Sequence, residues 1–163
     1  MSEQTKNSVL SGAKLRAKRE LVGLTVEELA NECGCDWNDI RSLEEPWRGV
    51  GVSDDVAIAV GVCLDELQER MSRTLDYAVS VYEEFADVAR TDAPAIVLPY
   101  YRDQAEFDKY SRDKGCYSFA NAVTRACLAA FEDFGVPTRL YYPAEDEELH
   151  AMATKSRTMG DTE

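Results

Sequence analysis

The sequence predicts a mainly α fold with a small β component, in which five short helices are followed by an α+β domain. Residues 11–71 carry apolar side chains at helical spacing, interrupted by glycines and helix-capping residues. After residue 71 the pattern changes to longer helical stretches and two short runs rich in β-branched and aromatic residues. We therefore expect a flexible segment at 1–10, a helical domain at 11–71, an α+β domain at 72–143 and an acidic, disordered tail at 144–163.

The first two helices are delimited by their capping residues. Ser11 is a suitable N-cap for a short basic helix, and Gly23 ends it because glycine readily adopts the left-handed conformation found at helix ends. Thr25 begins the next helix, with Glu28 three residues later as the second half of a capping box. Gly34 ends this second helix.

A third helix follows after a connection of only three residues. Asp36 is a strong N-cap for residues 37–44, in which Ile40 and Leu43 are expected to face inward. Two short helices joined this tightly, with Gly34 in the connection, are typical of a helix-turn-helix motif.

Residues 45–52 contain one proline and two glycines and are therefore expected to form a loop, over which we expect Trp47 to pack. Ser53 is expected to cap a fourth helix that ends at Gly61. A fifth helix should begin near Leu64 and run toward Met71.

These residues resemble a known class of DNA-binding domain. The run AKRELVGLTVEELANECGCDWNDIRSLEE, continued by VAIAVGVCLDEL, resembles the Cro/C1 (Xre) phage-repressor domain over residues 14–67. The resemblance implies a five-helix fold whose third helix enters the major groove of DNA. It also implies that Arg19 and Glu44 form a partly buried salt bridge rather than contacting DNA.

The resemblance suggests which residues would contact double-stranded DNA. Six candidates follow from it: Thr25, Trp37, Asn38, Arg41, Ser42 and Arg48. Trp37, Asn38 and Ser42 are expected on the exposed side of the third helix. Asn38 is suited to adenine, Arg41 to guanine or a phosphate, and Trp37 to a thymine methyl or a protein surface. The backbone N–H of Thr25 and the side chain of Arg48 are candidates for phosphates.

The charge of the chain favours a second interpretation. Its net charge is −13, and residues 1–71 carry 8 Lys and Arg against 14 Asp and Glu. Asp36, Asp39, Glu44 and Glu45 accompany the third helix, although residues 1–19 carry a local charge of +4. Because DNA affinity depends on neutralising phosphates, the alternative is a protein-interaction module, such as an antitoxin or adaptor, that keeps the fold.

The second half predicts two helices, a short helix and two strands. The expected elements, in order, are a helix at 75–90, a strand at 95–98, a short helix at 103–111, a helix at 119–134 capped by Ser118, and a strand at 138–142. Two strands make a marginal sheet, and operators with twofold symmetry need dimers, so we expect this half to form a homodimer. The order of its elements is similar to that of the carboxy-terminal half of anti-CRISPR-associated repressors.

Other functions receive little support from the sequence. No nucleophile–base pair, phosphate-binding glycine loop or carboxylate pair suggests an enzyme, and we expect no cofactor. Cys33, Cys63 and Cys127 lie among apolar neighbours, and no second ligand pair suggests a metal site. No apolar stretch is long enough for a membrane helix and no signal peptide is evident, so we expect a cytoplasmic protein.

Binding of a small-molecule or protein effector stays open. Six tyrosines of the second half are suited either to lining a pocket or to packing in a core: Tyr100, Tyr101, Tyr110, Tyr117, Tyr141 and Tyr142.

Overall fold

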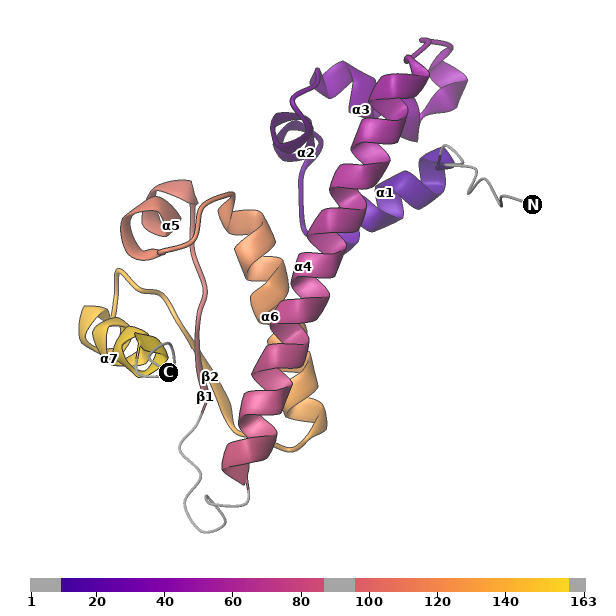
Figure 1. Ribbon diagram of the computed structural model, residues 1–163. Coiled ribbons are helices and arrows are strands. Elements are labelled where there is room, and N and C mark those ends of the chain that lie inside the picture. The colour runs from indigo at the N-terminus through magenta and orange to yellow at the C-terminus, as the bar shows by residue number, and fades with distance from the viewer. Residues whose placement is uncertain (1–9, 87–95, 159–163) are drawn as a thin grey trace. The chain divides into compact units, whose positions relative to one another are not determined.

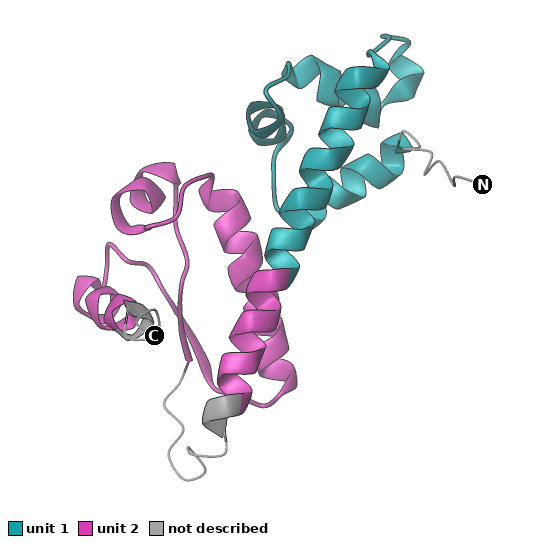
Figure 2. Ribbon diagram, in the orientation of Figure 1, with its two compact units in different colours: residues 1–72 teal, residues 73–163 magenta. Residues whose placement is uncertain are grey.

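The computed structural model describes residues 10–86 and 96–158, and it confirms a mainly α fold with a small β component (Figure 1). The chain divides into two compact units, residues 1–72 and 73–163, and the boundary lies within one long helix (Figure 2). Among the residues described, no helix combines the length and the apolar character needed to cross a membrane.

The first three helices follow the predicted caps. They are α1 (Gly12–Leu21), α2 (Val26–Cys33) and α3 (Trp37–Glu44). The Ser11 side chain accepts a hydrogen bond from the backbone N–H of Lys14, and both hydrogen bonds of the Thr25–Glu28 capping box are formed. These caps satisfy N–H groups that have no partner inside the helix, which is why the sequence locates the helix starts so closely.

The prediction of separate fourth and fifth helices is wrong. One helix, α4, runs from Asp54 to Ala86, and it includes Gly61 and most of the helix expected at 75–90. The rest of that expected helix lies outside the described residues. A glycine inside a helix costs only about 1 kcal/mol relative to alanine, and no proline interrupts this stretch. One buried stripe continues past Gly61, so packing offsets the cost; its residues are Ala57, Val60, Leu64, Leu67 and Met71.

The loop expected at 45–52 contains one 3-10 turn, η1 (Pro46–Arg48), followed by Gly49 in the left-handed conformation. The expectation that Trp47 packs over this loop is wrong, because 78% of its surface is exposed. The turn holds the indole away from the core of unit 1.

Unit 2 contains the only sheet among the residues described. Strand β1 (Ile96–Pro99) pairs in parallel with β2 (Thr138–Tyr141), with Ile96 opposite Thr138 and Pro99 opposite Tyr141. Parallel strands need a long crossover, which here contains α5 (Gln104–Tyr110) and α6 (Tyr117–Asp133). The predicted cap at Ser118 is wrong, because helix α6 begins one residue earlier, at Tyr117, and its N-cap is Cys116. The elements of this half therefore match the predicted order.

The core of unit 2 forms around Phe131 of α6, which is 2% exposed. Cys127 and Val136 are buried with it, and Leu75 and Tyr82 from the second half of α4 pack against them. The rings of Tyr82 and Phe131 meet edge to face, with centroids 5.9 Å apart. Tyr101 and Tyr141 are also buried, so these two tyrosines belong to the packed interior.

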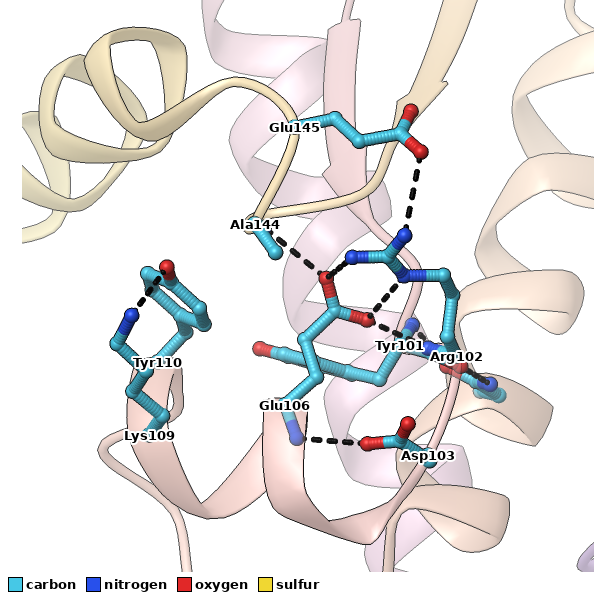
Figure 3. Close-up of polar contacts among 9 residues, drawn as sticks. Tyr101, Arg102, Asp103, Glu106, Lys109, Tyr110, Ala144 and Glu145 are labelled. Atoms are coloured by element: carbon cyan, nitrogen blue, oxygen red, sulfur yellow. Dashed lines mark hydrogen bonds and ion pairs between the residues drawn. The ribbon is translucent and has the colours of Figure 1, made fainter.

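Two polar side chains fix the ends of these elements. The buried carboxylate of Glu106 accepts hydrogen bonds from the backbone N–H groups of Arg102, at 2.7 Å, and Ala144, at 3.0 Å (Figure 3). The amide of Asn121 accepts from the N–H of Tyr101, at 2.9 Å, and donates to its carbonyl, at 2.7 Å. Both side chains satisfy backbone groups that follow the strands, which a buried backbone requires.

The prediction of a disordered tail is wrong for the residues described after 144. Helix α7 spans Glu147–Thr158 and is anchored by His150. Its Nε2–H donates to the carbonyl of Tyr110, at 3.0 Å, and its Nδ1 atom lies 2.9 Å from the hydroxyl oxygen of Tyr141. These long-range hydrogen bonds hold a helix in a polar segment that the sequence predicts to be disordered.

Candidate nucleic-acid interface

The candidate interface is the motif formed by α2, a short turn and α3 (Figure 1). Gly34 ends α2 with a φ of 67°, a left-handed conformation that a residue with a side chain rarely adopts. Asp36 then caps α3 by accepting a hydrogen bond from the backbone N–H of Asn38, at 2.8 Å. The three predicted connecting residues, 34–36, therefore join α2 to α3 by a short turn.

The inner side of α3 is fixed by buried contacts. Ile40 is completely buried, and the backbone of Gly12 in α1 lies so close that an added Cβ would be 2.5 Å from the carbonyl oxygen of Glu44. The predicted salt bridge is confirmed: Arg19 Nε lies 2.6 Å from Glu44 Oε1, and Arg19 Nη2 lies 3.0 Å from Glu44 Oε2. These contacts hold α3 against α1, which gives its outer side a defined orientation.

The outer side of α3 presents three of the predicted residues together. Trp37 is 43% exposed, Asn38 is exposed, and the side chain of Arg41 is 49% exposed. Arg41 lies four residues after Trp37 and three after Asn38, and side chains at these spacings are neighbours on the surface of an α-helix. The structure therefore brings an indole, an amide and a guanidinium onto one surface, a set that can read base edges or contact a protein.

The expected exposure of Ser42 is wrong. Its residue surface is only 7% exposed, although it lies on the same helix as the three exposed candidates. Serine is small, so little surrounding structure is needed to cover it. Ser42 therefore does not belong to the accessible surface, and the groove-facing set on α3 is reduced to Trp37, Asn38 and Arg41.

The candidate phosphate donor at the start of α2 already has a partner. The backbone N–H of Thr25 donates to Oε2 of Glu28 at 2.8 Å, while the Thr25 side chain accepts from the N–H of Glu28. The capping box predicted for this helix therefore places a carboxylate where a phosphate was expected. A phosphate would have to displace the Glu28 side chain to reach this N–H.

The two candidate arginines share one acidic partner. Oε2 of Glu45 lies 3.8 Å from Nε of Arg41 and 3.5 Å from Nη1 of Arg48. Sequence reasoning missed this role of Glu45, yet spacings of three and four residues in and beside a helix are those at which opposite charges meet. That spacing rule was the signal available for finding it.

The basic residues of α1 are also largely paired. Nε of Arg16 lies 2.8 Å from Glu20, Lys18 contacts Asp65 of α4, and Arg19 is buried with Glu44. The local excess of positive charge near the start of the chain is therefore partly neutralised within unit 1. Among the residues described, no group of three or more His, Cys, Asp or Glu is arranged to hold a metal ion.

A scan against models of protein families gives no match for this chain, and a search of curated proteins finds no match either.

Proposed function

We propose that this protein is a sequence-specific DNA-binding transcriptional regulator that acts as a homodimer in the cytoplasm. The observation that carries the proposal is the outer side of α3, where Trp37, Asn38 and Arg41 project together from a helix whose inner side is locked. A short helix held this way can enter the major groove with its first turn against the bases.

In this proposal each exposed group has a separate role. The amide of Asn38 has the donor and acceptor needed for adenine, and the guanidinium of Arg41 matches guanine. The indole of Trp37 offers apolar contact to a thymine methyl, and Arg48 contacts a phosphate. Two copies related by a twofold axis would place two α3 helices in successive major grooves of a palindromic operator.

Selection of bound sequences from random double-stranded DNA tests the proposal without knowledge of the regulated gene. We expect an enriched palindrome, a dimer mass in light scattering, and at least about a fivefold loss of affinity in the Asn38→Ala variant, since a good bidentate base contact contributes about 1–3 kcal/mol. Asn31→Ala is a matched control, because Asn31 is an exposed asparagine of α2 and its replacement also leaves the net charge unchanged. Enrichment of no sequence would refute DNA recognition, and a monomeric mass would refute the dimer.

A specific observation favours a second candidate function, contact with a basic protein. The Glu28 carboxylate accepts a hydrogen bond from the Thr25 N–H, and Glu45 forms ion pairs with both candidate arginines, Arg41 and Arg48. A surface that presents an exposed indole among carboxylates suits a partner rich in lysine and arginine. Binding of a basic protein that the Trp37→Ala variant loses, with no enriched DNA, would support this function and exclude the first.

A further inference from the structure

Glu45 occupies a special position, directly after the last residue of α3. It caps the carboxyl end of the helix, and its backbone N–H donates to the carbonyl of Arg41 at 3.0 Å. Its side chain is 29% exposed, so the carboxylate is partly covered while the guanidinium groups around it reach solvent. The helix end therefore determines where this negative charge lies.

One oxygen of that carboxylate faces both arginines. Oε2 is 3.5 Å from Nη1 of Arg48 and 3.8 Å from Nε of Arg41, and the two arginine side chains are 41% and 49% exposed. The arginines come from different elements, η1 and α3. Glu45 is thus a common acidic partner for two cations that would otherwise face solvent together.

We propose that Glu45 is an internal competitor that limits the affinity of this surface for phosphate-bearing polyanions, DNA above all. The inference deepens the proposed function and rests on it for the identity of the ligand. A carboxylate and a phosphate bind guanidinium in the same way, so only one of them can hold each arginine fully. Because Glu45 belongs to the same chain, it competes at a high effective concentration.

The same arrangement occurs at the start of α2, where the Glu28 carboxylate accepts from the Thr25 N–H at 2.8 Å. Glu28 also completes the cap of its helix, so its replacement would change stability and binding together. Glu45 makes no such side-chain cap, which makes it the better position for a test.

The test compares Glu45→Gln with Glu66→Gln. Glu66 is an exposed residue of α4 in the same unit, so both variants lose one negative charge. We expect Glu45→Gln to bind a selected duplex about twofold to thirtyfold more tightly than Glu66→Gln, the combined effect of two exposed ion pairs. The slope of the logarithm of the association constant against log salt should be steeper in Glu45→Gln by about 1 to 2. Each arginine that is released from Glu45 and contacts a phosphate adds about 0.9 to this slope.

A second comparison separates competition from general repulsion. If Glu45 acts through the two arginines, the gain disappears when Glu45→Gln is made in a chain that also carries Arg41→Ala and Arg48→Ala. A gain that persists in that background would overturn the proposal, because the carboxylate would then act by its charge alone. Unchanged thermal unfolding of Glu45→Gln serves as the folding check.

Heparin provides a polyanion that needs no operator. Glu45→Gln should elute from a heparin column at higher salt than Glu66→Gln, and equal elution would overturn the proposal whether or not the protein recognises DNA. A heparin shift without enrichment of any DNA sequence would refute the proposed function while leaving the competition by Glu45 in place.

Discussion

Removal of one partner of the Arg19–Glu44 pair should severely destabilise unit 1. Both residues are less than 10% exposed, and Arg19 makes three hydrogen bonds: two to Glu44 and one from Nη1 to the carbonyl of Leu24, at 2.8 Å. Glu44→Ala leaves a buried guanidinium with only the Leu24 contact. Breaking a buried pair in this way typically costs about 3–5 kcal/mol.

The double replacement Arg19→Met with Glu44→Leu provides the contrast. Apolar side chains of similar volume remove the cost of burying two charges, so the double variant should lie within about 1 kcal/mol of the parent or exceed it in stability. The sign of the difference between the single and double variants is therefore the informative quantity.

Urea unfolding followed by tryptophan fluorescence measures this difference. The chain has two tryptophans, Trp37 and Trp47, and both lie in unit 1, so their emission reports that unit alone. A loss below about 1 kcal/mol in Glu44→Ala, typical of an exposed pair, would refute the argument. So would a double variant less stable than the single one.

Three further predictions follow from local contacts. Gly12→Ala should destabilise unit 1 by about 1–3 kcal/mol, because its Cβ would lie 2.5 Å from the Glu44 carbonyl oxygen. Gly61→Ala should be neutral or stabilising, because its Cβ would meet only one atom, at 3.8 Å. Thermal unfolding checks both variants. Burial raises the pKa of Glu106, but hydrogen bonds from two backbone N–H groups and a guanidinium outweigh burial and lower the pKa overall. Glu106→Gln should therefore lower the free energy of unfolding by about 1–3 kcal/mol at pH 7. Because the folded pKa lies below the unfolded one, that difference should shrink as pH falls below about 4, and an equal difference at pH 7 and pH 3 would contradict it. Burial also raises the pKa of the Cys33 thiol, so its alkylation at pH 7, followed by peptide mass spectrometry, should be at least tenfold slower than in the unfolded chain; an equal rate would contradict it.

The sequence predicts best where structure is decided locally. Ser11, Thr25 and Asp36 each cap a helix through their own side chains, so the starts of α1, α2 and α3 depend on residues two or three positions away. Trp37 and Asn38 were correctly expected to be exposed, because they occupy the first turn of a helix whose buried side is set by Ile40.

The errors arise where distant contacts decide. Gly61 resembles a helix end in isolation, but buried residues on both sides of it continue one helix. Helix α7 depends on His150, whose partner Tyr110 is 40 residues away in the sequence. Ser42 is covered by surroundings that helical periodicity does not describe.

Part of the candidate site could have been deduced from spacing. Glu45 lies four residues after Arg41 and three before Arg48, which are distances at which charges pair. The sequence does not show that Glu45 competes with phosphate, because the same residues also suit an ordinary solvated helix end. The structure favours competition, since one oxygen of Glu45, Oε2, faces both Arg41 and Arg48.

The most direct test of the central claim is the salt dependence of binding to a selected duplex, measured by fluorescence anisotropy for the parent and for Arg41→Ala. We predict saturable binding in which the logarithm of the association constant falls linearly with log salt, and weaker binding in Arg41→Ala. The salt slope of Arg41→Ala should be shallower by about 1 if Arg41 contacts a phosphate, and unchanged if Arg41 reads guanine. Binding that is absent at low salt, or that is identical in the two proteins, would contradict the claim that the outer side of α3 recognises DNA.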